Sequence, residues 1–260
     1  MPLLYVLLLF AFTACNNQSK TSHDSPGVKQ NAPDSNPYRT IADIPAPKGY
    51  TRTLSNNDSY LSWLRRLPLK ENKTVYLYDG RLKINQAVQF AVLDVPVGNK
   101  NLQQCADAVM RLRAEYLYQQ KRIPDIDFSD NNHVHYRLQA SADRQVFDQY
   151  LEKVFACCGT ASLSNQLSPV SAFSQIRGGD ILVKGGAPGH AMQVIDIAVN
   201  NLGKKIYLLA QSYMPAQDIH VVINPSDRQL SPWYEVNDQP VIETPEWTFY
   251  QGNLKRWPGE

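Results

Sequence analysis

The chain has 260 residues, of which 43% are hydrophobic and 19% charged, which is typical of a globular protein and excludes an intrinsically disordered one. Its 26 basic and 24 acidic residues give a formal net charge of +2, without any run of Lys and Arg, so the sequence predicts no nucleic-acid partner. The four cysteines and five histidines form no CxxC or HExxH motif, so we expect no metal site and no cofactor.

The N-terminus is apolar from Leu3 to Ala14, a stretch too short to span a bilayer and typical of a secretory signal. It ends in Phe-Thr-Ala-Cys, which resembles a bacterial lipobox, although the usual basic segment before the apolar run is absent. In such signals the cysteine, here Cys15, becomes the lipidated N-terminus after cleavage. The sequence therefore predicts a signal peptide at 1–14 and a bacterial envelope protein, anchored to a membrane by lipid on the extracytoplasmic side. An ordinary secretory signal and a cytosolic apolar helix are the alternatives.

Residues 16–36 are rich in Asn, Ser, Asp, Gln, Lys and Pro and contain almost no large apolar side chain. Such a segment buries too little surface to offset the entropy of ordering it. We therefore interpret 15–36 as lipid anchor and disordered tether, and 37–260 as a single folded domain.

In the first half of this domain, the apolar spacing predicts a helix over 59–67, ended by Pro68. The dipeptide Asp79-Gly80 predicts a hairpin, with 87–97 as its long arm. The next segment has helical periodicity over 102–120, with Asn101 as the expected N-cap.

Further along, a strand is expected near 133–138 and helices over 145–155 and 160–167. Three mostly apolar strands follow at 180–184, 190–199 and 205–213, joined by short turns, which predicts an antiparallel meander. Helices followed by an antiparallel sheet indicate an α+β fold.

Three residues are candidates for nucleophilic catalysis. Cys105 lies near the expected helix start, where free backbone N–H groups and the helix dipole lower a thiol pKa. His190 opens a strand directly after a Gly-rich turn. If the next turn is centred on 200–203, Gln211 or a close neighbour reaches the His190 ring and fixes its tautomer, which gives a Cys-His-polar triad.

Each candidate has an alternative interpretation. His190 can be an ordinary core or surface histidine after a turn, and Gln211 can be a buried amide whose hydrogen bonds are satisfied. Cys105 also lies on the apolar helix face, where a packed structural thiol is common, and a disulfide with Cys157 or Cys158 would remove it as a nucleophile. Either of those two cysteines is a weaker nucleophile candidate, and His220 is an alternative base. The candidate substrate-binding residues are Gly186, Gly189 and Tyr213.

Six blocks of the chain resemble a family of envelope lipoproteins known as the domain of unknown function four-eight-four-six. These blocks are SWLRRLPL (62–69), LYDGRLK (77–83), LQQCADAVMRLRAEY (102–116), GGAPGHA (185–191), LAQSYMPAQ (209–217) and TPEW (244–247). The resemblance covers nearly the whole folded part but implies no established activity.

A second, weaker resemblance is to NlpC-type cell-wall cysteine peptidases, through GDILV (179–183), the Gly turn, His190 and a polar residue ending the next strand. It implies a papain-like fold with the chain order Cys105, His190, Gln211. Two features depart from that family: Cys105 lacks the Asp-Cys-Ser context, and the gap from Cys to His is longer. The resemblance and the order of the three candidate residues nevertheless favour a thiol hydrolase acting on amide bonds of a peptide or cell-wall fragment. The alternative is a non-catalytic binding or assembly protein, with contact aromatics at Trp63, Trp233, Tyr234 and Trp247.

Overall fold

The three strands expected in the C-terminal half are present and form the centre of the main sheet. They are β6 (Ile181–Lys184), β7 (His190–Asn200) and β8 (Lys205–Gln211), and β7 pairs antiparallel with both neighbours. Asn200 Oδ1 shapes the β7–β8 turn by accepting hydrogen bonds from the backbone N–H groups of Leu202 and Lys204, both at 3.0 Å. The predicted meander is therefore confirmed.

The computed structural model describes residues 35–260. The predicted signal peptide, Cys15 and the tether as far as residue 34 lie outside the described residues. Packing begins slightly before the expected boundary at 37, because Asn36 Nδ2 donates a hydrogen bond to the Lys70 carbonyl at 2.8 Å.

Nine strands of the described part form the main sheet, and every pairing in it is antiparallel. Its order is β2-β9-β8-β7-β6-β13-β5, with β1 also paired to β7 and β10 to β8. The remaining members are β1 (Tyr50–Arg52), β2 (Gln89–Val92), β5 (Ser168–Pro169), β9 (His220–Val222), β10 (Tyr234–Glu235) and β13 (Leu254–Arg256). Two small hairpins stand apart: β3 (Asp127–Ser129) with β4 (His135–Arg137), and β11 (Val241–Glu243) with β12 (Thr248–Tyr250).

The predicted helices are present with small shifts at their ends. They are α1 (Tyr60–Arg65), α2 (Cys105–Gln119), α3 (Arg144–Cys157) and α4 (Thr160–Gln166), and the 3-10 turns are η1 (Ile41–Asp43), η2 (Ile123–Asp125) and η3 (Phe173–Gln175). Side chains cap two of the starts: Ser59 Oγ accepts from the Ser62 N–H, and Asp143 Oδ1 accepts from the Val146 N–H.

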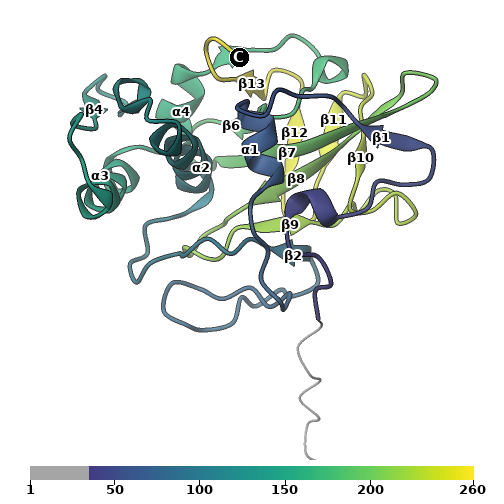
Figure 1. Cartoon of the computed structure of the whole chain (residues 1–260), viewed down its shortest axis with the longest axis horizontal. Coiled ribbons are helices and arrows are strands. Elements are labelled where there is room, and N and C mark those ends of the chain that lie inside the picture. Colours follow the sequence, from purple (N-terminus) through teal and green to yellow (C-terminus); the bar gives the residue numbers. More distant parts are fainter. Residues whose placement is uncertain (1–34) are drawn as a thin grey trace, which may run out of the picture. The chain divides into compact units, whose positions relative to one another are not determined.

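The main sheet separates two cores, because alternate side chains of each strand point to opposite faces. On one face the helices contribute Leu64, Met110 and Phe147, which pack with sheet residues such as Leu208. On the other face Tyr207 and Leu209 pack with Ile242 and Phe249 of the β11–β12 hairpin. In Figure 1, α1 lies over β7 and β8, whereas β11 and β12 lie behind them. The α+β class, with helices packed on an antiparallel sheet, is therefore confirmed.

One predicted pairing is wrong. The turn at Asp79-Gly80 exists, with a single bridge between Tyr76 and Leu82, but 87–97 is not an arm of that hairpin. Its strand, β2, pairs instead with β9, where Val92 lies opposite His220. The partner lies about 130 residues away in the chain, too far for a local turn signal to reveal it.

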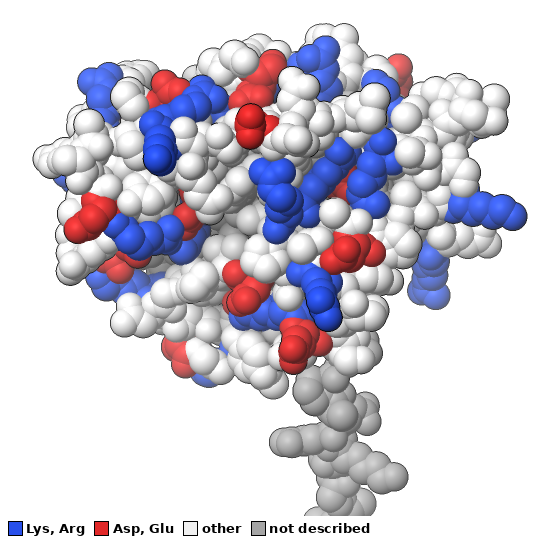
Figure 2. Space-filling model, in the orientation of Figure 1, with Lys and Arg blue, Asp and Glu red and all other residues white. Residues whose placement is uncertain are grey.

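No helix of residues 35–260 has the length and apolar character that crossing a bilayer requires. Figure 2 shows Lys and Arg interspersed with Asp and Glu over the face it presents.

Candidate active site

Cys105 is the first residue of α2, three residues after the expected start of this helix. The expected cap, Asn101, is not the N-cap: its Oδ1 instead accepts the N–H of Ala216 at 2.8 Å. The cap position belongs to Gln104, whose backbone N–H donates to Asp107 Oδ2 at 2.9 Å. Cys105 therefore lies closer to the helix N-terminus than the sequence indicated.

The Cys105 sulfur is surrounded by backbone N–H groups but is largely buried, with 6% of the residue exposed. Burial raises its pKa to about 11, although the N–H groups of Ala191, Ala106 and Cys105 itself act to lower the pKa. The sequence-based expectation of a lowered thiol pKa is therefore wrong, because the loss of solvation outweighs the helix terminus.

His190 and Gln211 are in contact at the ends of neighbouring strands. His190 Nε2 lies 2.8 Å from Gln211 Oε1, and a carbonyl oxygen only accepts, so Nε2 carries the proton. The His190 Nδ1 lone pair is then available as a base. Burial lowers the pKa of His190 to about 4, while the Gln211 contact acts to raise it.

The orientation of the Gln211 amide is set by Glu246, to which the sequence analysis assigned no role, and by His220, which it named as an alternative base. Gln211 Nε2 donates to Glu246 Oε2 at 2.7 Å, and Glu246 pairs with Lys83 at 2.5 Å. His220 contributes as well, since its Nδ1 lies 2.9 Å from the Asp218 carbonyl and its Nε2 lies 3.3 Å from Gln211 Nε2. The His220 Nδ1 therefore donates and its Nε2 accepts. His220 supports Gln211, and its burial lowers its own pKa to about 4.

Three aromatic rings surround the His190 imidazole. The centroid distances are 4.8 Å to Tyr213, 5.3 Å to Trp247 and 6.0 Å to Phe249. Trp247 and Glu246 both come from the turn between β11 and β12. This hairpin therefore covers the His190 side of the site, which leaves 1% of His190 exposed.

A cleft of about 260 Å³ adjoins Cys105, and we call it the Cys105 cleft. Gly186 and Gly189 line it together with Asp107, Cys158 and Thr160. A Cβ on Gly189 would come within 2.3 Å of both the Gly186 carbonyl oxygen and Thr160 Oγ1, so this wall accommodates only glycine there. His190, Gln211 and Tyr213 are not among the lining residues.

The structure thus brings the three candidate triad residues to one end of the sheet. No hydrogen bond joins Cys105 to His190 in the described part of the chain. They share two neighbours instead. The Ala191 N–H lies beside the sulfur. Tyr213 contacts the His190 ring, and its pKa is raised by burial and, to a smaller extent, by Glu246 and Cys105.

The alternative assignments are also placed. Cys105, Cys157 and Cys158 are all free thiols, so the disulfide considered above is not formed among the described residues. Of the aromatics suggested as contacts for a partner, Trp63, Trp233 and Tyr234 are buried and Trp247 is half-buried. Residues 35–260 hold no cluster of three or more His, Cys, Asp or Glu placed to hold a metal ion.

A family model matches residues 41–140 and 129–256 and carries the description Domain of unknown function (4846). Comparisons with curated proteins and with solved structures find no match.

Proposed function

The chain belongs to the family described as Domain of unknown function (4846), and because this description assigns no activity, we propose a function from the candidate site. The proposed activity is thiol-dependent hydrolysis of amide bonds in a peptide or cell-wall fragment, on a papain-like arrangement of α2 against the sheet. The observation that carries it is the His190–Gln211 contact, which leaves Nδ1 unprotonated at the end of β7. The next residue, Ala191, lies beside the Cys105 thiol.

In this proposal Cys105 Sγ attacks the amide carbonyl carbon while its proton passes to His190 Nδ1. The C–N bond then breaks, and the imidazolium gives the proton to the leaving amine. Water, deprotonated by the same ring, hydrolyses the thioester and restores the thiol. In this proposal, the backbone N–H groups at the start of α2 stabilise the oxyanion.

The pKa shifts favour a proton transfer during the attack over a resting ion pair. With the Cys105 pKa at about 11 and the His190 pKa at about 4, both groups are neutral at pH 7. The thiol therefore needs the ring as a general base, as serine nucleophiles do. Hydrogen bonds of this kind often tighten only when substrate binds.

A membrane-anchored location in the bacterial envelope is also part of the proposal. It rests on the short apolar N-terminus and on Cys15 after Thr-Ala. A lipid on Cys15 would hold the domain at the membrane, and the polar segment after it would serve as a spacer.

A second candidate function is favoured by the same burial. Because Cys105 and His190 are 6% and 1% exposed and both neutral, the site also fits a non-catalytic protein that binds a ligand in the Cys105 cleft. The two functions differ in whether His190 affects the reactivity of Cys105.

Labelling with a peptidyl vinyl sulfone at pH 7, followed by peptide mapping, separates the two candidates. We expect Cys105 to be modified, and Cys105→Ser to abolish this modification. His190→Ala should slow it by about a hundredfold, in line with the loss of a general base. Gln211→Ala and Glu246→Gln should slow it less, since both residues act only by orienting the ring.

The matched control is Cys157→Ser, which removes an exposed thiol on α3 and should leave Cys105 labelling unchanged. If Cys105 reacts at the same rate with and without His190, the hydrolase proposal fails and the binding function takes its place.

A further inference from the structure

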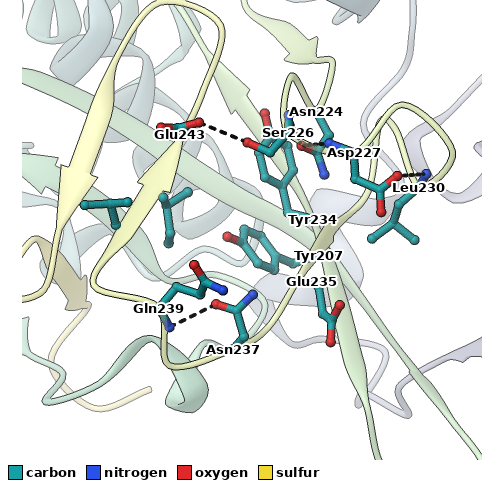
Figure 3. A pocket seen from close by; sticks show the side chains of 12 residues that line it. Tyr207, Asn224, Ser226, Asp227, Leu230, Tyr234, Glu235, Asn237, Gln239 and Glu243 are labelled. Carbon is teal, nitrogen blue, oxygen red and sulfur yellow. Dashed lines mark hydrogen bonds between the residues drawn. The ribbon is translucent and has the colours of Figure 1, made fainter.

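A second cavity, of about 370 Å³, lies beside β8 and β10 and shares no lining residue with the Cys105 cleft. We call it the tyrosine cavity, because Tyr207 and Tyr234 stack in it with their ring centroids 5.5 Å apart. The other lining residues are Asn224, Ser226, Asp227, Leu230, Glu235, Asn237, Gln239, Val241, Ile242 and Glu243. Figure 3 shows the two rings between the Ser226–Glu243 pair on one side and Asn237 with Gln239 on the other. Its volume lies within the roughly 300–1,000 Å³ range of small-molecule sites.

The two tyrosine hydroxyls differ in how they are satisfied. Tyr234 donates to the Ile223 carbonyl at 2.5 Å. Tyr207 is 1% exposed, yet its hydroxyl has no hydrogen-bond partner within residues 35–260. The Tyr207 side chain is buried, but its hydroxyl oxygen reaches the surface of the cavity, where a ligand can supply a hydrogen-bond partner.

The charge of the lining is of one sign. Asp227, Glu235 and Glu243 contribute carboxylates, and no Lys or Arg is among the lining residues. Lys204 is not a lining residue, although its ammonium lies 3.9 Å from the Glu235 carboxylate. Anionic ligands are therefore disfavoured and cationic ones attracted.

Two of these carboxylates keep an oxygen free to accept a hydrogen bond. Glu243 Oε2 accepts from Ser226 Oγ at 3.3 Å, and Asp227 Oδ1 accepts from the N–H groups of Gln229 and Leu230. Glu243 Oε1 and Asp227 Oδ2 have no hydrogen-bond partner in the described part of the chain. In that part of the chain, no group of three or more His, Cys, Asp or Glu residues is placed to hold a metal ion. The carboxylate oxygens without a partner suit a ligand that carries N–H donors.

We propose that the tyrosine cavity binds an organic cation, namely an ammonium or guanidinium group, with Glu243 and Asp227 accepting its N–H bonds and Tyr207 Oη as a further acceptor. Asn237 and Gln239 supply additional polar groups at the same opening. The group can come from a basic amino-acid side chain or from an amino sugar, which share this chemistry. This proposal uses none of the groups assigned to amide hydrolysis, so the cation-binding proposal and the hydrolase proposal can be tested independently.

Calorimetric titration of the purified full-length chain at low salt tests the proposal. The probes are Nα-acetyl-lysine amide, Nα-acetyl-arginine amide and glucosamine, against the neutral Nα-acetyl-norleucine amide and N-acetylglucosamine. We expect at least one cationic probe to bind at least tenfold more tightly than its neutral counterpart, and to bind more weakly as salt rises. The amino-acid and sugar arms identify the source of the cation.

Two variants locate the binding. Glu243→Gln and Tyr207→Phe should each weaken the favoured probe about tenfold or more, in line with a hydrogen bond to a charged group. Glu152→Gln is the matched control, because it removes an exposed carboxylate on α3 that pairs with Lys100. It should leave the binding unchanged.

Three results would overturn the proposal. The first is equal binding of neutral and cationic probes, which would indicate a saccharide or other neutral ligand. The second is that no cationic probe binds, and the third is that Glu243→Gln leaves the binding unchanged. Glu243 is exposed, so this last variant stays informative even if Tyr207→Phe lowers stability.

Discussion

The two carboxyl oxygens of Asp107, which lies near the candidate nucleophile, are in different environments. Its Oδ2 accepts the Gln104 N–H and closes the first turn of α2, while its Oδ1 is buried without a partner among the described residues. Burial raises the pKa of Asp107 to about 8. The residue that shapes the helix start is therefore protonated at neutral pH, which spares Cys105 a neighbouring negative charge.

This raised pKa predicts a pH-dependent stability. The unfolded chain releases the Asp107 proton near pH 4, whereas the folded protein holds it until about pH 8, so the free energy of unfolding falls as pH rises between these values. Asp107→Asn keeps an acceptor for Gln104 but does not titrate. Between pH 6.5 and pH 8, we expect the stability of the wild type to fall relative to this variant by roughly 1.5 kcal/mol.

Urea denaturation of both proteins at the two pH values measures this difference. The contributions of His190 and His220 are common to both and cancel. A difference that does not change with pH would show that Asp107 is ionised in the folded protein at pH 6.5.

Among the elements, β1 and α1 are tied to β7 through one buried carboxylate. Asp196 lies at a bulge in β7, is fully buried, and accepts from Arg52 Nε at 2.7 Å and from Arg65 Nε at 2.6 Å. Asp196→Asn removes the charge that both guanidinium groups share. Because a buried pair is broken, we expect a loss of about 3–5 kcal/mol in the free energy of unfolding.

Denaturant titration measures this loss, and Glu152→Gln serves as the comparison. That variant breaks an exposed pair with Lys100 and should cost less than about 1 kcal/mol. Similar costs for the two variants would mean that Asp196 does not hold these elements together.

The elements that the sequence predicted well are those with local signals. The β6–β8 meander follows from apolar runs and the turn at Asn200, and the same register arithmetic placed Gln211 within reach of His190. The start of α2 was missed because Asp107, from inside the helix, satisfies the Gln104 N–H, while Asn101 turns away to Ala216.

The supporting residues of the site could not be found in the same way. Lys83 and Glu246 meet across 163 positions of the chain, and although each lies in a block that resembles the family, no local pattern pairs the two. The raised pKa of Cys105 was missed as well. It depends on how much solvent the surrounding elements exclude, which a helix-start argument does not contain.

For the whole molecule, attachment to a membrane would depend on one atom, the Cys15 sulfur. Because Cys15 follows Thr-Ala at the end of a short apolar stretch, we expect Cys15→Ala to block maturation or move the protein from the detergent phase to the aqueous phase. Phase partitioning of cell extracts measures this. Cys157→Ala, which keeps the predicted lipidation site, should partition as the wild type does, and unchanged partitioning of Cys15→Ala would exclude a lipid anchor on that residue.

The order of strands in the main sheet has a consequence for how the chain can fold. Three pairs join strands that are far apart in the sequence: β1 with β7, β2 with β9 and β5 with β13. In these pairs Thr51 lies opposite Val199, Gln89 opposite Val222 and Ser168 opposite Arg256. Each pairing closes a long loop, and such closures are slow because their entropy is lost before the contacts form. The sheet therefore completes only after its last strand has emerged. A chain exported as proposed would therefore complete its main sheet only on the extracytoplasmic side, after Arg256 has crossed the membrane.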